Sequence, residues 1–345
     1  SFFYSKIHFL LIFLLFSSYF HKSVCCSDFK TFSDTEDEDD VFTFVMSTSP
    51  TTTRLPEHPN MKLLPDTCGE ISGSVYRIFG GEIANLYDFP WVALIGYRTG
   101  DSLAVFSCSG SLINPKYVLT AAHCIKNTII GVRIGEFDMI NKKDCDNFVC
   151  DSEVQVIFIP KYFGDLPIEE IITHPKYAIY PYITHDIALI RLQRSVNMTY
   201  SNVGIICLPV TPSLRNAIIT GKQATVVGWG LTEHNKVSNI LRRVDVPVSS
   251  REECKNYYRV GDRQTDKMTE EEFTAICAGG YHRDSCRGDS GGPLFITDVY
   301  KSFYAHSYIQ FGIVSHGPRI CGNGVPAVYT DVRMFVDWIL NNIRE

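Results

Sequence analysis

The sequence predicts an all-β protein, a sandwich or a barrel, that ends in one α-helix. Between residues 78 and 345, short apolar stretches rich in β-branched and aromatic side chains end at Gly, Pro or Asn, as short strands do. Examples are 91–97, 117–120 and 224–229. Helical spacing is sustained only near the end, where Phe335, Trp338, Ile339 and Ile343 recur at three- and four-residue steps.

The first 22 residues are predicted to be a secretory signal peptide. They contain one apolar run, residues 9–16, with Lys6 before it and Ser17 and Ser18 after it. A helix that crosses a bilayer needs about 20 apolar residues, so this short run favours a signal peptide over a membrane anchor. A signal-anchored surface protein is the alternative. We therefore expect a secreted, extracellular protein whose cysteines form disulfides.

Residues 23–77 are predicted to form a disordered, acidic and Pro-rich propeptide tether ahead of a domain at 78–345. Residues 34–40 carry six acidic side chains, residues 47–53 are rich in Ser and Thr, and three prolines follow by residue 65. Such a segment buries too little apolar area to offset the entropy lost on ordering. A docking site for a basic partner is the alternative interpretation of the acidic run. Only Cys68 suggests that the tether is fastened to the domain.

The charge balance argues against nucleic-acid binding. The chain has 32 basic and 38 acidic residues, a net charge of −6, and the run at 34–40 contains six of the acids. The remainder is therefore neutral, and no basic surplus exists to neutralise phosphates.

Three short motifs in the predicted β region carry residues suited to nucleophilic catalysis. They are Thr-Ala-Ala-His-Cys ending at Cys124, Thr-His-Asp-Ile-Ala-Leu-Ile starting at Thr184, and Gly-Asp-Ser-Gly-Gly-Pro starting at Gly288. Singly, each has an ordinary structural explanation: a core histidine, a strand-capping aspartate and a glycine loop. Together they supply a nucleophile, a base and a carboxylate.

A serine hydroxyl is a weak nucleophile until a base takes its proton, and imidazole, with an ordinary pKa of about 6.5, can do so near neutral pH. A buried carboxylate holds one imidazole tautomer and stabilises the cation formed during attack. Glycines beside the serine let successive N–H groups converge on a developing oxyanion. The chain order His, Asp, Ser is one of the few known for this group of residues.

These motifs resemble those of the chymotrypsin-like serine proteases, over all of residues 78–345. The resemblance implies two six-stranded antiparallel β-barrels with the site between them. It also implies that His123 is the general base and acid, Asp186 its orienting carboxylate and Ser290 the nucleophile, with the N–H groups of Gly288 and Ser290 forming the oxyanion hole.

The resemblance extends to an activation site and to a specificity pocket. Arg-Ile-Phe-Gly-Gly at 77–81 is similar to the family's activation site, where cleavage after Arg77 frees the amine of Ile78 to pair with Asp289. Asp284 matches the base of the primary pocket, where a carboxylate selects Arg or Lys. The positions that match the pocket walls are Ser315, His316 and Gly317 on one side and Ala327 on the other.

Two of these wall positions depart from the trypsin-like pattern, which usually has Trp where His316 stands and Gly where Ala327 stands. Because the extra methyl of Ala327 narrows the pocket, we expect Arg to be favoured over Lys. His316 is expected to alter contacts with the substrate residues just before the cleaved bond.

Spacing alone cannot pair the ten cysteines from Cys68 to Cys321. The resemblance implies three disulfides, and we expect two more, one that holds the tether and one that closes a small loop. The expected pairs are Cys108–Cys124, Cys254–Cys277, Cys286–Cys321, Cys68–Cys207 and Cys145–Cys150.

The extra loop pair and the stretch 168–177 look like the arthropod clip-domain proteases, such as the easter-like and prophenoloxidase-activating enzymes of haemolymph and related venom proteases. A clip domain needs six cysteines ahead of the linker, whereas only Cys25 and Cys26 precede Cys68. The apolar stretch 154–163 has no explanation in this pattern.

The chemistry of this family requires no cofactor, but two further features point to ligands. Glu136 and Asp138, followed by more acids as far as residue 153, offer oxygen ligands suited to Ca²⁺, and related enzymes bind calcium in this loop. A solvated acidic loop is the alternative. Asn197-Met-Thr fits an N-glycosylation acceptor.

These features lead us to expect a secreted, monomeric trypsin-like serine endopeptidase, made as a zymogen and acting in an extracellular cascade or in venom. Its expected partners are a protein substrate such as another zymogen, an upstream activating protease and a serpin-type inhibitor. The alternative is a non-catalytic protease homologue that acts as a cofactor or binding protein.

Overall fold

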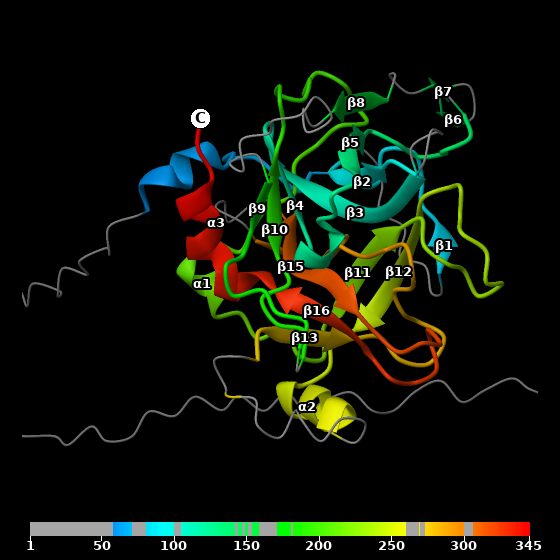
Figure 1. Ribbon diagram of the computed structural model, residues 1–345, viewed down its shortest axis with the longest axis vertical. Helices are drawn as coiled ribbons and strands as arrows, with labels where there is room; N and C mark the ends of the chain where they lie inside the picture. Colours follow the sequence, from blue (N-terminus) through cyan, green and yellow to red (C-terminus); the bar gives the residue numbers. More distant parts are fainter. Residues whose placement is uncertain are drawn as a thin grey trace, which may run out of the picture. The chain divides into compact units, whose positions relative to one another are not determined.

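The structure is a computed structural model, and the chain divides into two units, residues 1–54 and 55–345. The described residues all lie in the second unit (Figure 1). They are 58–70, 81–99, 105–141, 144–146, 149–150, 154–158, 171–180, 182–259, 269, 273–299 and 306–345. The predicted signal peptide, the acidic run, Cys25 and Cys26 lie outside these ranges.

One antiparallel sheet is formed by the first half of this unit, in the order β8-β5-β2-β3-β4-β10-β9. Its strands are β2 (Val92–Tyr97), β3 (Val105–Asn114), β4 (Tyr117–Thr120), β5 (Ile129–Ile134), β8 (Gln155–Phe158), β9 (Ile171–Thr173) and β10 (Ala188–Arg191). β2 and β4 are buried along their whole length, as expected for strands covered on both faces. A separate two-stranded ladder joins β6 (Cys145–Asp146) to β7 (Val149–Cys150).

The second antiparallel sheet has the order β1-β12-β11-β14-β15-β16-β13. Its strands are β1 (Glu82–Ile83), β11 (Gln223–Gly228), β12 (Arg242–Pro247), β13 (Ala275–Ala278), β14 (Pro293–Val299), β15 (His306–His316) and β16 (Ala327–Asp331). Figure 1 shows both sheets strongly curled, and this arrangement confirms the predicted all-β, chymotrypsin-like fold class.

The strand count differs from the expected six in each half, since each sheet has seven strands among the described residues. In the second sheet the additional strand is β1, which is only two residues long and pairs with the edge strand β12. In the first sheet, β8 and β9 lie at opposite ends of the order but follow each other along the chain.

β8 also explains part of the apolar stretch 154–163, because it pairs in register with β5 from Ile134↔Gln155 to Gly131↔Phe158.

Buried side chains from the two sheets meet directly. The rings of Trp91 and Phe295 are both fully buried, and their centroids lie 5.6 Å apart in an edge-to-face arrangement. Between β3 and β15, the Ser111 hydroxyl donates a 2.6 Å hydrogen bond to Gln310 Oε1. Aromatic packing and a satisfied buried polar pair therefore fix one sheet against the other.

The predicted C-terminal helix is confirmed as α3 (Val336–Asn342), which follows the 3₁₀ helix η6 (Val332–Phe335) and buries Val336, Ile339 and Leu340. Two further helices, α1 (Pro212–Arg215) and α2 (Arg251–Arg259), were not predicted. The start of α2 has a capping box, in which Ser250 Oγ accepts from Glu253 N and Ser250 N donates to Glu253 Oε2. No helix within the described ranges is long and apolar enough to cross a membrane.

The predicted disordered tether is wrong for residues 58–70, which pack on the domain. The 3₁₀ helix η1 (Pro59–Leu63) lies beside α3, and Asn60 Nδ2 donates to the carbonyls of Leu340 and Ile343 at 2.8 and 3.1 Å. These bonds satisfy carbonyl groups that a helix end leaves without partners. Leu64 is buried, and the backbone of Gly69 exchanges hydrogen bonds with Ile205 and Tyr308. Composition did not reveal this docking because it depends on partners more than 130 residues away.

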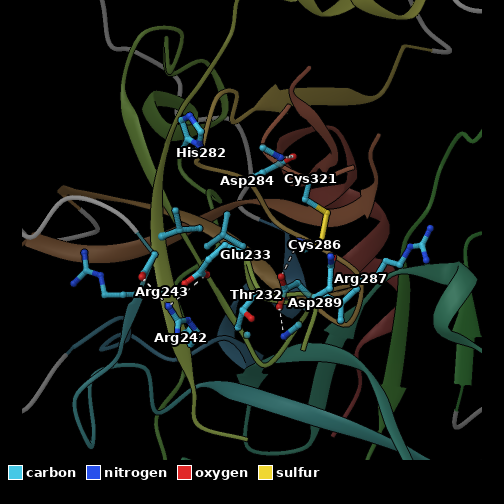
Figure 2. Close-up of a pocket in the computed structure, with 18 of the residues that line it drawn as sticks. Thr232, Glu233, Arg242, Arg243, His282, Asp284, Cys286, Arg287, Asp289 and Cys321 are labelled. Carbon is cyan, nitrogen blue, oxygen red and sulfur yellow. Dashed lines mark hydrogen bonds and ion pairs between the residues drawn. A yellow bond between two sulfur atoms is a disulfide. The ribbon is translucent and has the colours of Figure 1, made fainter. Parts of the chain in front are cut away.

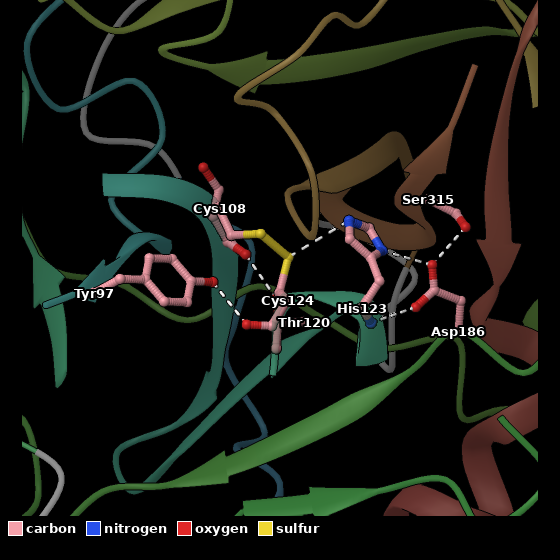
Figure 3. Close-up of a disulfide and its surroundings, with 8 residues drawn as sticks. Tyr97, Cys108, Thr120, His123, Cys124, Asp186 and Ser315 are labelled. Carbon is pink, nitrogen blue, oxygen red and sulfur yellow. Dashed lines mark hydrogen bonds and ion pairs between the residues drawn. A yellow bond between two sulfur atoms is a disulfide. The ribbon is translucent and has the colours of Figure 1, made fainter. Parts of the chain in front are cut away.

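Four of the five expected disulfides are present. They are Cys68–Cys207, Cys108–Cys124 (Figure 3), Cys254–Cys277 and Cys286–Cys321 (Figure 2). In the fifth expected pair, Cys145 of β6 lies directly opposite Cys150 of β7 in the backbone pairing. The side chains of these two cysteines lie outside the described part of the chain.

Candidate active site

His123 and Asp186 come from the ends of neighbouring strands. β4 pairs with β10, with Thr120 opposite Ala188, so the residues that follow β4 and those that precede β10 lie at the same sheet edge. There His123, in the 3₁₀ helix η2 (Ala122–Cys124), donates its backbone N–H to Asp186 Oδ1 at 2.9 Å. Its ring Nδ1 lies 2.8 Å from Asp186 Oδ2 (Figure 3). Two contacts to one carboxylate fix the orientation of the imidazole and leave Nε2 on its other side.

Asp186 is almost completely buried, and hydrogen bonds keep it ionised. Burial opposes its negative charge, but hydrogen bonds from the His123 ring and backbone and from Ser315 outweigh that effect, so the pKa of Asp186 lies below its ordinary value. Ser315 Oγ donates to Asp186 Oδ2 at 2.5 Å. The sequence placed Ser315 only in the wall of the specificity pocket, so this second role was missed.

Ser290 lies where the two sheets meet. Its carbonyl accepts from Ser109 N of β3 at 2.7 Å, and the next residue, Gly291, donates to Val314 O of β15 at 2.8 Å. A Cβ built on Gly291 would lie 3.2 Å from Cys124 Sγ, and that sulfur is 3.7 Å from His123 Nε2. The loop carrying Ser290 and the His123 ring thus contact the same disulfide. Within the described residues, no hydrogen bond joins the Ser290 hydroxyl to His123, and such bonds are often long in ligand-free enzymes.

The loop before Ser290, the predicted oxyanion loop, makes a tight turn that requires glycine. Gly288 has φ +106°, and a Cβ there would come within 2.8 Å of Gly230 Cα, so only glycine fits without strain. Asp289 N donates to Cys286 O and Gly292 N donates to Asp289 O, which closes the turn. In the described part of the chain, the N–H groups of Gly288 and Ser290 have no hydrogen-bond acceptor and are available to an anion.

Asp289 is one of the residues that line a large cavity (Figure 2). Gly230 N and Cys286 N donate to its two carboxylate oxygens at 2.8 and 2.9 Å, and burial raises its pKa. The cavity has a volume of about 760 Å³, and Gly81 also lines it. Arg77 and Ile78, the predicted activation residues, lie outside the described residues. Gly81, which lines the cavity, follows Ile78 by three positions in the sequence.

Asp284 lines the same cavity and is held by the Cys286–Cys321 loop. Gly322 N donates to Asp284 Oδ2 at 3.0 Å, whereas the buried Oδ1 has no hydrogen-bond partner among the described residues. Burial is the main reason that its pKa is raised to about 6, and the charge of Asp289 adds to the effect. A buried carboxylate with an unsatisfied oxygen is suited to receive a cationic side chain.

The predicted wall residues lie near one another, but none of the four is among the residues that line the cavity with Asp284. Ala327 of β16 is buried, and a Cβ built on Gly317 would lie 3.2 Å from the Ala327 Cβ, so these two positions face each other closely. His316 Nδ1 lies 3.1 Å from Ser315 Oγ, which connects the wall to the Asp186 hydrogen-bond network. Burial lowers the pKa of His316 to about 4, so this ring is neutral at physiological pH.

The predicted calcium loop gathers its carboxylates but supplies protein partners to most of them. Glu136 Oε2 accepts from Arg133 at 2.7 Å, and Asp144 Oδ2 accepts from the N–H groups of Phe137 and Asp138. Burial raises the pKa of both Glu136 and Asp144, and Asp144 Oδ1 is buried without a hydrogen-bond partner among the described residues. Asp138, the second predicted ligand, accepts from Ile140 N and Asn141 Nδ2. Asp144 is therefore the residue in this loop that best fits a cation.

Asn197, the predicted glycosylation acceptor, is exposed after β10. Its Oδ1 accepts from the hydroxyl and the N–H of Thr199.

Comparisons with known proteins agree with the fold. The family model described as Trypsin matches residues 78–339. The chain is 39% identical to CLIP domain-containing serine protease B4 of Anopheles gambiae, over 84% of this chain and 74% of that protein. It is 39% identical to Melanization protease 1 of Drosophila melanogaster (85% and 72% covered) and 36% identical to Phenoloxidase-activating factor 1 of Holotrichia diomphalia (82% and 74%).

A solved structure, the crystal structure of the Drosophila Grass clip serine protease of the Toll pathway, superposes with a TM-score of 0.67. The match has 32% sequence identity and covers 81% of this chain and 76% of that one. The two curled sheets and the Asp186–His123 pair at their edge define a chymotrypsin-like serine protease scaffold. The chain belongs to the trypsin family of serine proteases, and its clip-domain relatives confirm the resemblance drawn from the motifs.

Proposed function

We propose that this protein is a secreted serine endopeptidase that cleaves after Arg, and less readily after Lys. The observation that carries the proposal is the orientation of His123. Its Nδ1 and its backbone N–H both bind Asp186. Its Nε2 faces the Cys108–Cys124 disulfide, which also contacts the loop that carries Ser290. That geometry supports proton transfer between Nε2 and the Ser290 hydroxyl.

In the proposed reaction, Ser290 Oγ attacks the scissile carbonyl as His123 Nε2 takes its proton. Asp186 stabilises the imidazolium, and the N–H groups of Gly288 and Ser290 stabilise the oxyanion. His123 then gives the proton to the leaving amine, which departs and leaves an acyl-enzyme on Ser290. A water molecule, deprotonated by the same imidazole, hydrolyses the ester and frees the serine.

We further propose that the chain is a zymogen activated by cleavage between Arg77 and Ile78. The new ammonium of Ile78 would enter the cavity lined by Gly81 and pair with Asp289, whose buried charge has only N–H donors among the described residues.

The names Melanization protease 1 and Phenoloxidase-activating factor 1 support a place in an extracellular proteolytic cascade of the immune type. Its protein substrate would be another zymogen, its activator an upstream protease and its inhibitor a serpin; a venom role fits the same chemistry.

The test is to cleave the purified protein at Arg77 and to assay short chromogenic Arg substrates. We expect turnover that is lost by several orders of magnitude in Ser290→Ala, with little further loss in Ser290→Ala/His123→Ala, because these residues act as a unit. If fully cleaved, folded wild-type protein shows no more activity than Ser290→Ala, the endopeptidase proposal fails and the protein is a non-catalytic homologue.

Calcium binding at the Glu136 loop is proposed as a structural feature only. The buried Asp144 Oδ1, which has no hydrogen-bond partner among the described residues, supports it. Adding EDTA should lower the melting temperature, and Ca²⁺ should restore it in the wild type but not in Asp144→Asn. An unchanged melting temperature on adding EDTA would discard the proposal.

A further inference from the structure

Ser315 and His316 are neighbours in β15, and their side chains contact each other because the strand is bulged there. Val314 pairs with Tyr329 of β16 and His316 pairs with Val328, so β15 has one residue more than its partner at this point. In a regular strand, successive side chains point to opposite faces. The bulge removes that alternation, and His316 Nδ1 lies 3.1 Å from Ser315 Oγ.

The bulged segment also contacts both halves of the active site. Val314 exchanges two backbone hydrogen bonds, 2.8 and 2.9 Å long, with residues 291–292, which follow the predicted nucleophile. Ser315 Oγ donates to Asp186 Oδ2 at 2.5 Å (Figure 3). A change in how the bulge holds Ser315 is therefore transmitted to the Asp186 carboxylate.

The directions of these hydrogen bonds follow from the number of protons. Ser315 Oγ carries one proton, and the ionised carboxylate of Asp186 can only accept, so that proton is committed to Asp186. His316 Nδ1 must then be the donor in its contact with Ser315 Oγ. Because burial lowers the pKa of His316 to about 4, its ring is neutral at physiological pH, and a neutral imidazole protonated on Nδ1 has no proton on Nε2. The contacts thus require one particular tautomer.

The charged groups that act on His316 are two members of the proposed triad. The Asp186 carboxylate raises the pKa of His316 and a protonated His123 lowers it, both by less than burial does. During the proposed reaction the positive charge must form on His123, which binds Asp186 directly. A neutral His316 adds a hydrogen bond to this network and no competing charge.

We propose that His316 is a positioning residue for the triad, because its Nδ1–H donates to Ser315 Oγ and directs the Ser315 hydroxyl at Asp186. This inference rests on the proposed function and adds a residue to the group that holds Asp186. The trypsin-like pattern has Trp at this position, and an indole ring has carbon where imidazole has Nδ1, so that pattern cannot supply the donor. Hydrogen bonds in series strengthen one another, and a neutral one changes an equilibrium by about threefold to tenfold.

The activity test compares His316→Phe with His316→Asn, both cleaved at Arg77, on a chromogenic substrate that contains a single blocked arginine. This substrate has no residue before the arginine, so any effect of His316 on such residues does not enter. Phenylalanine keeps a ring but has no donor, whereas the asparagine amide places an N–H as many bonds from Cα as imidazole Nδ1. We expect His316→Phe to lower kcat about threefold to tenfold with KM changed by less than about twofold, and His316→Asn to keep kcat within about twofold.

A double variant tests whether His316 acts through Ser315. Ser315→Ala/His316→Phe should lose no more activity than Ser315→Ala alone, because the hydroxyl that His316 directs is already gone. Losses that multiply in the double variant would show an independent role for His316. Full kcat in His316→Phe together with a loss in His316→Asn would show that the shape of the ring matters and its donor does not. Either result overturns the inference.

The tautomer is measured without turnover, by nitrogen NMR of the full chain with isotope-labelled histidine at neutral pH. We expect His316, assigned by the signal that His316→Phe lacks, to be protonated on Nδ1 in the wild type and to shift toward the Nε2–H form in Ser315→Ala. An Nε2–H tautomer in the wild type would overturn the inference whatever the kinetics. If the wild type cleaves no arginine substrate, the proposed function has failed, whereas the tautomer still decides the donor role of His316.

Discussion

The hydroxyl of Ser315 donates to the same carboxylate oxygen of Asp186 that the His123 ring binds. The two contacts, 2.5 Å and 2.8 Å long, come from residues that lie 129 and 63 positions from Asp186 in sequence. Asp186 also receives the His123 backbone N–H on its other oxygen, so its charge is fixed by three donors in a buried setting. The carboxylate is thus held in place by the second sheet as well as by the first.

Ser315→Ala should lower kcat/KM about tenfold on a chromogenic Arg substrate. A hydrogen bond to a charged group contributes about 1.5–3 kcal/mol, and its loss both raises the pKa of Asp186 and loosens the orientation of His123. The matched control is Ser111→Ala, a buried serine that donates to the neutral Gln310 and should leave kcat/KM within about twofold. Equal losses in the two variants would mean that Ser315 acts through general stability alone.

Asp289→Asn should leave cleavage at Arg77 intact and reduce the activity of the cleaved enzyme by at least about a hundredfold. A buried ion pair that loses one partner is strongly destabilised, and the oxyanion loop depends on this residue. The uncleaved variant should be as stable as the uncleaved wild type or more so, because an unpaired buried carboxylate has been removed. Gel analysis of cleavage, active-site assays and thermal melts measure the three quantities.

The control for Asp289 is Glu233→Gln, an exposed carboxylate that lines the same cavity. It should retain wild-type activity. Full activity in cleaved Asp289→Asn would show that the zymogen does not use this ion pair.

The fold class and the pairing of His123 with Asp186 could be predicted because each motif is local and its order along the chain is diagnostic, whereas the role of Ser290 stays a prediction. What could not be predicted depends on contacts between distant segments. Asn60 caps a helix 280 residues away, and the role of Ser315 toward Asp186 appears only when β15 is packed against the other sheet. Helix α2 is a different case, since the Ser250-x-x-Glu253 capping box was visible in the sequence and could have signalled its start.

Ala327→Gly should narrow the preference for Arg over Lys. The Ala327 methyl lies close to Gly317, and its removal makes room for a water molecule to bridge the shorter lysine ammonium to Asp284. We expect kcat/KM for Lys peptides to rise about tenfold while that for matched Arg peptides changes less. Ala275→Gly, in β13 and paired with Thr330 rather than beside the pocket, is the control. An Arg-to-Lys ratio unchanged by Ala327→Gly would contradict the proposed effect of the methyl group.

His174 should make the protein less stable in mild acid. Its ring stacks on His185 at 4.9 Å and packs against Phe335 and Trp338, and burial, together with the charge of His185, lowers its pKa to about 4. Between the ordinary histidine pKa of about 6.5 and pH 4, the unfolded chain takes up a proton at this site and the folded chain does not. Stability must therefore fall as pH drops through this window.

His174→Phe keeps an aromatic ring in the stack and removes the titration, so its unfolding free energy should depend less steeply on pH between 6.5 and 4. Denaturant melts at several pH values measure the slope. His316, whose pKa is also lowered to about 4 by burial, contributes in the same direction and accounts for a residual slope in the variant. A His174→Phe slope as steep as that of the wild type would place the acid sensitivity elsewhere, since the linkage requires the group that titrates to carry the pH dependence.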